Sequence, residues 1–265
     1  MNQGFLRTRA VWLCLVLSLC ATVASAQGTA VTAQPAVTET KAAPCDRYGI
    51  VTVVRCMGHD VLGIGNRDSL LWLGAGGLLA AASHPADDDV LRAFATTEHS
   101  TAYVVGDHLG FAGVQFGVPA AAYFISRASG HQDAADLSIM LVRTQVVNAI
   151  FTRGLKLLPR ARPYQETASP GQGSFPSGHA SASFATATVL QRKWGWRVGV
   201  PAYAVAGFIG ATRLENVHYL SDVTFGAALG IASGLAVKMP SSRVALTPAI
   251  SPGRAGLFIT VGPRS

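Results

Sequence analysis

The residues best suited to carry chemistry are Phe175-Pro176-Ser177-Gly178-His179, which lie at the start of an apolar run. Serine is a preferred N-cap residue, and glycine beside it lets an anion approach the backbone closely. The free N–H groups and the dipole of a first helical turn favour negative charge. His179 would lie in that turn, where an imidazole can give a proton to a leaving oxygen. Taken alone, the segment is more simply explained as an ordinary helix cap with an exposed histidine.

A second group of candidates is cationic. Lys156, Arg160 and Arg162 follow one another at the end of an apolar run, directly before Pro163. Arginine offers phosphate a planar pair of hydrogen bonds, whereas lysine offers a point charge. Taken alone, these side chains would be a solvated helix end, which the helix dipole also favours.

The third group contains Arg213, His218 and Asp222. His218 and Asp222 are four residues apart, so on a helix they would share a face. A carboxylate that accepts a hydrogen bond from one imidazole nitrogen leaves the other nitrogen free as a nucleophile. Arg213 would add a phosphate contact. The alternative is a surface pair between Arg213 and Glu215, with Asp222 as a helix cap.

The order of the three groups resembles that of the type 2 phosphatidate phosphatase superfamily, which also includes bacterial acid phosphatases and vanadium haloperoxidases. The resemblance covers roughly residues 69–238, and residues 176–179 and 218–222 match the family pattern closely. Two basic segments are each one residue shorter than the family pattern, between Lys156 and Arg162 and between Arg213 and His218. The side chains can converge if these deletions fall in loops, because a deletion within a helix would rotate them by about 100°.

The resemblance implies a role for each residue. His218 would attack phosphorus to form a phosphohistidine, Asp222 would orient His218, and His179 would protonate the leaving alkoxide and then help to activate water. The phosphate oxygens would be bound by Lys156, Arg162, Arg213, Ser177 and the backbone N–H of Gly178. Fixed cations and a helix N-terminus can supply the charge neutralisation that phosphoryl transfer needs. We therefore expect a metal-independent, cofactor-free phosphatase acting on phosphomonoesters or lipid (di)phosphates.

Two other functions share these residues. The same pocket could hold vanadate in a haloperoxidase, or it could persist in a non-enzymatic envelope protein. No metal site is expected, because the remaining histidines lack metal-ligand spacing. The acidic run 87–89 is expected to be a solvated helix start, and Asp107 a helix cap. No basic run is interleaved with aromatics, so nucleic acid is not an expected partner.

Six apolar segments could position the site. They cover about residues 69–83, 109–126, 134–158, 177–193, 198–214 and 221–238. Each is long enough for a helix and none alternates strictly as a strand does, while Pro119 should kink the second. We therefore predict an all-α domain over 61–240, a bundle of about six helices with the active site at helix ends. The β-prone runs 244–250 and 255–261 predict a short hairpin within a C-terminal tail, 241–265.

The N-terminal residues 1–26 have the features of a secretory signal, with Arg7 and Arg9 before a continuous apolar stretch and small residues at the end. An uncleaved anchor is the alternative. Export would favour a disulfide between Cys45 and Cys56 within a flexible lead-in, 27–60, whose second half could be extended or a short strand.

The composition leaves the relation to the membrane open. Hydrophobic residues make up 49% of the chain and charged residues 13%, and the formal net charge is +7. A helix that spans a bilayer needs about 20 apolar residues, and most of these runs are shorter. We expect a periplasmic bundle, soluble or peripheral to the membrane, with an integral membrane bundle as the alternative. The substrate carries phosphate and could be a lipid or a soluble ester.

Overall fold

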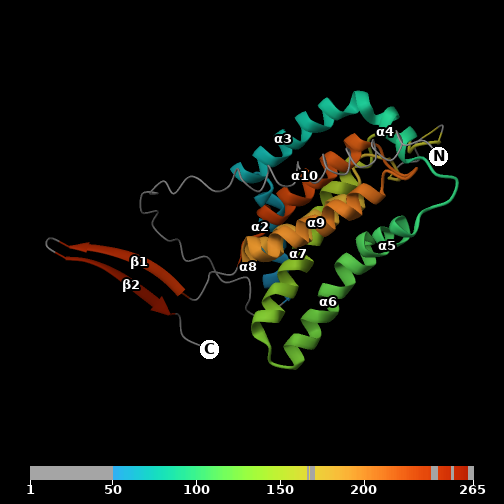
Figure 1. The fold of residues 1–265 in the computed structure, drawn as a ribbon. Coiled ribbons are helices and arrows are strands. Elements are labelled where there is room, and N and C mark those ends of the chain that lie inside the picture. The colour runs from blue at the N-terminus through green and yellow to red at the C-terminus, as the bar shows by residue number, and fades with distance from the viewer. Residues whose placement is uncertain (1–49, 166, 168–170, 240–243, 252–253, 262–265) are drawn as a thin grey trace.

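The computed structural model describes residues 50–165, 167, 171–239, 244–251 and 254–261, which are mainly helical (Figure 1). The elements in chain order are α2 (Ile50–Gly63), α3 (Arg67–Ser83), the 3-10 turn η1 (His84–Ala86), α4 (Asp87–Phe94), α5 (Thr101–Gly110), α6 (Ala112–Ala128), α7 (Gln132–Leu155), α8 (Gly178–Trp194), α9 (Trp196–Thr212), α10 (Leu220–Ala236), β1 (Val244–Ser251) and β2 (Arg254–Val261).

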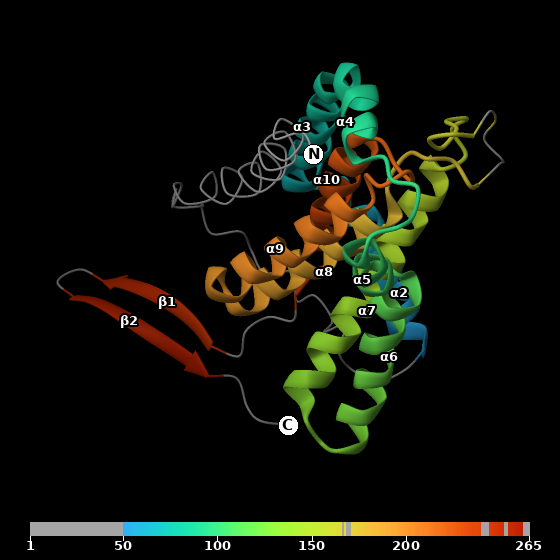
Figure 2. The same cartoon turned by 45° about the vertical axis from the view of Figure 1, so that its right-hand side comes forward.

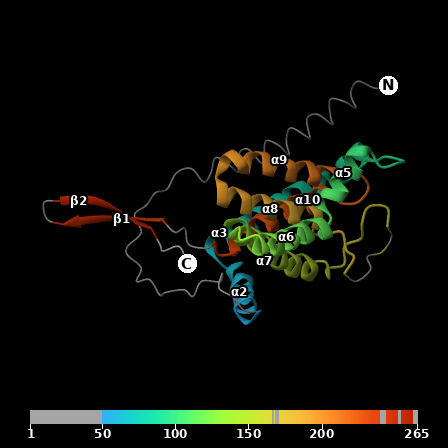
Figure 3. The ribbon, with the colours of Figure 1, turned by 90° about the horizontal axis from the view of Figure 1, so that it is seen from below.

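Helix α10 lies at the centre of the bundle. It packs against α8 on one side and α3 on the other, and α9 and α7 pack against α8. Figure 2 shows α3 and α4 on one side of this centre and α5 and α6 on the other. Seen from below in Figure 3, α6 and α7 lie side by side, as their contacts require. Helices α8 and α10, whose first turns carry His179 and Asp222, are therefore the innermost ones.

The contact between α8 and α10 is close because one face of α10 has no side chains. Gly226 and Gly230 are four residues apart and so share that face. A Cβ atom would lie 2.7 Å from the carbonyl oxygen of Ser177 at Gly226, and 2.2 Å from that of Ser181 at Gly230. The α10 backbone thus rests directly on α8, and the first turns of both helices are held together.

A small apolar cluster packs against the first turns of α8 and α10. Val90 of α4 and Ala180 of α8 pack with Leu214, Leu220 and Val223 around the start of α10, and all five side chains are buried. Because Ala180 directly follows His179 in the chain, the packing of this cluster fixes the position of the α8 N-terminus relative to α10.

The fold class predicted from the sequence is confirmed. The six apolar segments correspond to α3, α6, α7, α8, α9 and α10, and the predicted hairpin is present as antiparallel β1 and β2. Helices α4 and α5 were not predicted as separate elements. Pro119 lies within α6, where the expected kink stays a prediction, and a separate bend of 47° falls between α5 and α6, at Phe111.

The expected extended segment before residue 60 is also wrong, because Ile50–Gly63 forms α2. The β-branched residues in this segment favour a strand, but tertiary contacts override such preferences. Asp60 of α2 accepts two hydrogen bonds from Arg143 of α7, at 2.7 and 2.8 Å, and both side chains are buried. This ion pair and the packing of α2 on α7 stabilise the helix.

Several predictions concern the N-terminal region outside the described residues. The signal segment 1–26 and most of the lead-in lie there. Cys56 is disulfide-bonded, but Cys45 is outside the described residues, so the pairing of these two cysteines stays a prediction.

By length and composition alone, α7 is the one helix of the described ranges that could cross a membrane, and α5 with α6 would add a second if the bent pair counts as one span.

Candidate active site

Both shortened basic segments fall outside helices. Helix α7 ends at Leu155, so Lys156 takes the C-cap position and the chain to Pro163 is non-helical. Helix α9 ends at Thr212, and Arg213 is its C-cap. The missing residues therefore come from a loop and a turn, and the cationic side chains remain free to turn towards the start of α8.

His218 and Asp222 lie together, although not on one helix face as expected. His218 precedes α10, whereas Asp222 is in its first turn, and their Nδ1 and Oδ2 atoms are 3.6 Å apart. This separation is longer than a hydrogen bond. The hydroxyl of Ser174 lies between them, 3.4 Å from Nδ1, and donates to Oδ2 at 2.5 Å. Oδ2 also accepts the backbone N–H of Tyr219 at 3.0 Å.

The second nitrogen of His218 faces a cation. Nε2 is 3.5 Å from Nη1 of Arg162, and the imidazole is only 3% exposed. Burial lowers the pKa of His218 to about 4, since the charges of Arg162 and Lys156 add to the effect and Asp222 only partly opposes it. Near neutral pH the ring is therefore uncharged, which is the form that can attack an electrophile.

Asp222 stays ionised despite its burial. Burial alone would raise its pKa, but interactions with His218 and Ser174 and the charge of Arg160 together lower it. Arg160 Nη1 lies 3.1 Å from Asp222 Oδ1, and Arg160 Nη2 donates to Asp87 Oδ2 at 2.8 Å. Asp87 was expected to be a solvated helix start. It does lie in the first turn of α4, but its side chain is buried, because these polar groups surround it.

Lys156 and Arg162 are held beside the loop that precedes α8. Lys156 Nζ donates to the carbonyl of Gly173 at 2.8 Å, and Arg162 Nε donates to that of Gln172 at 3.2 Å. Burial, followed by the nearby charge of Arg162, lowers the pKa of Lys156 to about 8. Burial likewise lowers the pKa of Arg162. Two incompletely solvated cations thus lie near His218, and Arg162 faces its Nε2.

His179 and Arg213 meet at Asp107, which the sequence analysis did not assign to the site. Arg213 is 1% exposed, and its Nη1 donates to Asp107 Oδ1 at 2.6 Å while its Nη2 donates to the carbonyl of Tyr103 at 3.0 Å. The same Asp107 oxygen lies 3.2 Å from His179 Nε2. Burial and the charge of Arg213 lower the pKa of His179, and Asp107 opposes this shift. Asp107 is therefore not a helix cap as expected, because it lies well inside α5.

The alternative pairing of Arg213 with Glu215 is not formed. Glu215 instead accepts hydrogen bonds from the backbone N–H and the hydroxyl of Ser100, at 3.0 and 2.5 Å. This contact ties the start of α5 to the turn that carries Arg213. Helix α5 is consequently anchored over the start of α8, close enough that a Cβ at Gly110 would lie 2.7 Å from His179 Cδ2.

The first turn of α8 presents unused polar atoms. Gly178 begins the helix, and Ser177 occupies the N-cap position with its backbone N–H bound to the carbonyl of Asp222 at 3.0 Å. Within the described residues, the buried Ser177 Oγ and Arg213 Nε have no hydrogen-bond partner. Buried polar atoms without partners are rare and indicate a ligand or solvent site. The charge of Arg162 contributes to lowering the pKa of both His179 and His218.

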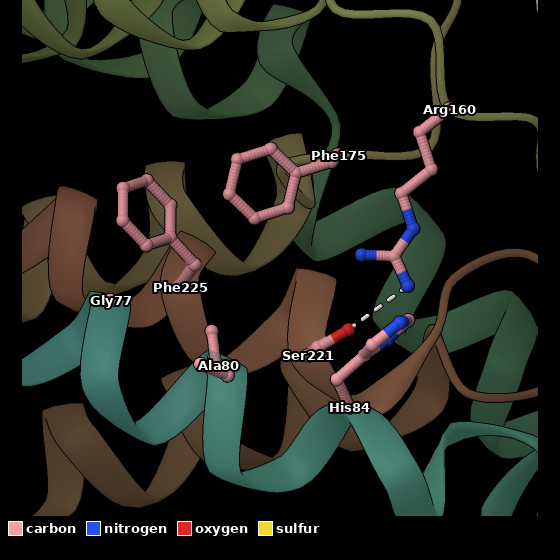
Figure 4. A pocket seen from close by; sticks show the side chains of 8 residues that line it. Gly77, Ala80, His84, Arg160, Phe175, Ser221 and Phe225 are labelled. Atoms are coloured by element: carbon pink, nitrogen blue, oxygen red, sulfur yellow. Dashed lines mark hydrogen bonds between the residues drawn. The ribbon is translucent and has the colours of Figure 1, made fainter.

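A separate cavity of about 370 Å³ lies beside Arg160 (Figure 4). Its polar end is formed by Arg160, Ser221 and His84. Phe175 and Phe225 line its apolar part, with their rings tilted by 36° and their centroids 4.8 Å apart. Elsewhere in the described part of the chain, no group of three or more His, Cys, Asp or Glu side chains is arranged to hold a metal ion.

Sequence reasoning missed Ser174 and Asp107 for different reasons. Ser174 is one serine in a glycine-containing loop, and only the folded loop brings it between His218 and Asp222. Asp107 meets Arg213 across 106 positions of the chain, so no local spacing could reveal the pair.

Comparison with known proteins gives a family for this region. Residues 138–242 match the family model of the PAP2 superfamily. The lipid A 1-phosphatase of Porphyromonas gingivalis is 36% identical over 113 residues, which are 41% of this chain and 24% of that protein. The decaprenylphosphoryl-5-phosphoribose phosphatase of Mycobacterium tuberculosis is 35% identical over 97 residues, 35% of this chain and 54% of that protein. The chain thus spans between a quarter and about half of the curated relatives it matches.

Among solved structures, the comparison finds the transmembrane PAP2 type phosphatidylglycerolphosphate phosphatase of Bacillus subtilis, at 18% identity and a TM-score of 0.41, covering 71% of this chain and 92% of that one. The family match includes every site residue predicted from the sequence, from Lys156 to Asp222. Residues 138–242 are thus similar to the PAP2 superfamily, as the resemblance indicated.

Proposed function

We propose that this protein is a metal-independent phosphatase that hydrolyses phosphate esters, preferentially of lipids, through a phosphohistidine at His218. The observation that carries the proposal is the two-sided environment of this imidazole. Nδ1 lies on the side of the carboxylate of Asp222, and Nε2 lies on the side of the cation Arg162. A phosphate bound to that cation would present its phosphorus atom to a neutral nitrogen.

The two chemical steps follow from this placement. In the first, Nε2 of His218 forms a bond to phosphorus while the P–O bond to the leaving alkoxide breaks and His179 gives that alkoxide a proton. In the second, water attacks the phosphohistidine, His179 takes up the proton from water, and orthophosphate leaves. Asp222 stabilises the positive imidazole between the steps, and the cations with the α8 N-terminus offset the phosphate charge.

The position of α5 and α6 supports a lipid substrate. Large apolar side chains are exposed along both helices, namely Val104, Val105, Leu109, Phe111, Val114, Phe116, Val118, Phe124 and Ile125. Exposed apolar surface on this scale marks a binding or membrane surface. Helix α5 also carries Asp107 and Gly110, which contact Arg213 and His179, so the apolar surface reaches the catalytic groups.

We accordingly propose that the protein works at a membrane surface outside the cytoplasm, where the predicted signal 1–26 would deliver it. The two curated relatives are named as phosphatases of lipid A and of a decaprenyl-linked phosphoribose, which agrees with a lipid-phosphate substrate class. Their names do not specify the lipid for this chain.

The test is a phosphate-release panel on the full-length protein in detergent, with phosphatidate, a prenyl diphosphate and p-nitrophenyl phosphate as substrates. His218→Ala should lower turnover at least about 1,000-fold on every substrate, because the nucleophile is lost. The matched control is His131→Ala, which removes an exposed histidine before α7. A chelator should leave wild-type activity intact. Activity that needs a divalent ion, or that survives in His218→Ala, would contradict the proposal.

A further inference from the structure

The carboxylate of Asp87 has every oxygen engaged. Oδ1 accepts the backbone N–H of Ser221 at 2.9 Å, and Oδ2 accepts the hydroxyl of Ser221 at 2.6 Å and Arg160 Nη2 at 2.8 Å. His84 Nδ1 lies 2.8 Å from the same Oδ2. Asp87 is 3% exposed and belongs to the first turn of α4, while Ser221 belongs to the first turn of α10. Asp87 is therefore a fixed anchor between two helices.

Arg160 joins this anchor to the catalytic carboxylate. Its Nη2 holds Asp87, and its Nη1 lies 3.1 Å from Asp222 Oδ1. Oδ1 makes no hydrogen bond to any of the described residues, so Arg160 is the cation that faces it. The guanidinium also lies 4.8 Å from the centre of the Tyr219 ring, and Figure 4 shows it directed at Ser221. A planar group with several donors is needed to reach both carboxylates.

The two oxygens of Asp222 consequently serve different partners. Oδ2 faces His218 and accepts Ser174 Oγ, while Oδ1 faces Arg160. We propose that Arg160, held by Asp87, is a positioning residue that fixes Asp222 and thereby sets the protonation of the nucleophile. The proposal rests on the phosphatase function above. It also separates Arg160 from Lys156 and Arg162, because the charge of Arg160 is balanced by two carboxylates, whereas the other two cations donate to backbone carbonyls.

The sign of the effect follows from the charges around His218. This imidazole faces Asp222 of α10 and, from the segment after α7, Arg162 and Lys156. Arg160 partly neutralises Asp222, so its removal strengthens the negative field at His218 and favours the protonated ring. Loss of the Asp87 charge should weaken the negative field at His218 and favour the neutral ring, because the positive charge of Arg160 is then balanced by Asp222 alone. The two changes should move the pKa of His218 in opposite directions.

The experiment compares Arg160→Gln and Asp87→Asn with a matched control, Arg153→Gln, which removes an exposed arginine of α7. Release of phosphate from p-nitrophenyl phosphate is followed from about pH 3 to about pH 8, since the acid limb of kcat/KM reports the nucleophile of the free enzyme. Arg160→Gln should move this limb up by at least about 0.5 pH unit, and Asp87→Asn should move it down by a similar amount.

The steady-state constants add a second criterion. Because Arg160 does not touch the substrate, Arg160→Gln should lower kcat about 10-fold or more and change KM less than about two-fold. Arg160→Lys keeps the charge but cannot bridge both carboxylates, so it should move the acid limb less than Arg160→Gln and still lower kcat. If Arg160→Gln does not fold, Arg160→Lys carries the test.

Several results would overturn the inference. The acid limb of the kcat/KM profile could stay in place in both variants, or move in the same direction in both. Alternatively, Arg160→Gln could raise KM strongly with kcat unchanged, which would make Arg160 a phosphate ligand. Nuclear magnetic resonance titration of His218 measures the same pKa shifts without any turnover. It therefore distinguishes failure of the inference, with shifts absent and activity intact, from failure of the phosphatase proposal, with shifts present and activity absent.

Discussion

The substitution Gly226→Ala tests whether the α8 N-terminus is the phosphate site. The new Cβ would lie 2.7 Å from the carbonyl oxygen of Ser177 and 3.3 Å from its nitrogen, where ordinary contacts begin at 3.4 Å. The clash of about 0.7 Å involves backbone on both sides, so it is relieved only when α10 and Ser177 move apart. Such overpacking costs about 1–3 kcal/mol, and the better helix propensity of alanine returns about 1 kcal/mol.

The net loss of stability should therefore be small and the loss of activity large. A change of 1 kcal/mol shifts the Tm of a domain of this size by about 2–4 °C, so we expect a fall of only a few degrees. A displacement of about 1 Å in a catalytic site costs up to about 100-fold in rate. We expect kcat/KM for a phosphate ester to fall about 10- to 100-fold, with weaker inhibition by orthophosphate.

The assay measures thermal unfolding, kcat/KM and the inhibition constant of orthophosphate on the same preparations. Gly74→Ala is the matched control, since this α3 glycine has no atom within 4 Å of the added Cβ. It should gain about 0.5–1 kcal/mol in stability and keep full activity. If Gly226→Ala keeps the kcat/KM and the orthophosphate inhibition constant of the wild type, phosphate does not bind at this helix start.

The structure supports two further predictions. The pH profile of kcat/KM should be bell-shaped with an acidic maximum. His218 must lose its proton, near pH 4, to act as nucleophile, whereas His179 must keep its proton and has a pKa lowered from 6.5. A maximum above about pH 8 would contradict these roles. Asp60→Asn should lower the free energy of unfolding by about 3–5 kcal/mol in a denaturant titration, because it leaves Arg143 buried without its ion pair. The exposed control Asp68→Asn should cost less than about 1 kcal/mol, and equal losses in both variants would refute the importance of the buried pair.

The helical framework was predictable because its signals are local. Long apolar runs bounded by turn residues gave α3 and α6 to α10, and the residues 244–261 gave the hairpin. The errors arose where tertiary contacts decide. Helix α2 forms from β-branched residues because Asp60 binds Arg143, and α5 begins directly after Ser100 because Glu215 holds that serine. These contacts join segments 83 and 115 positions apart, so no window of the sequence contains them.

The candidate site was predictable to a similar extent. The types and order of His179, His218 and Asp222 were sufficient to propose a phosphohistidine mechanism. The partners of these residues were not, because Ser174 and Asp107 reach them only through the folded loop and helix α5. Arg160 looked like another phosphate ligand by composition. Its geometry instead directs it to two buried carboxylates.

The central claim is tested most directly by trapping the intermediate. The full-length protein would be mixed with a substrate labelled in its phosphate group, quenched within milliseconds in alkali, and digested for mass spectrometry. We predict a phosphorylated imidazole at His218 that is stable in alkali and lost in acid, and that is absent from His218→Ala. Phosphate on another residue, or rapid turnover with no phosphorylated protein at any quench time, would contradict the account.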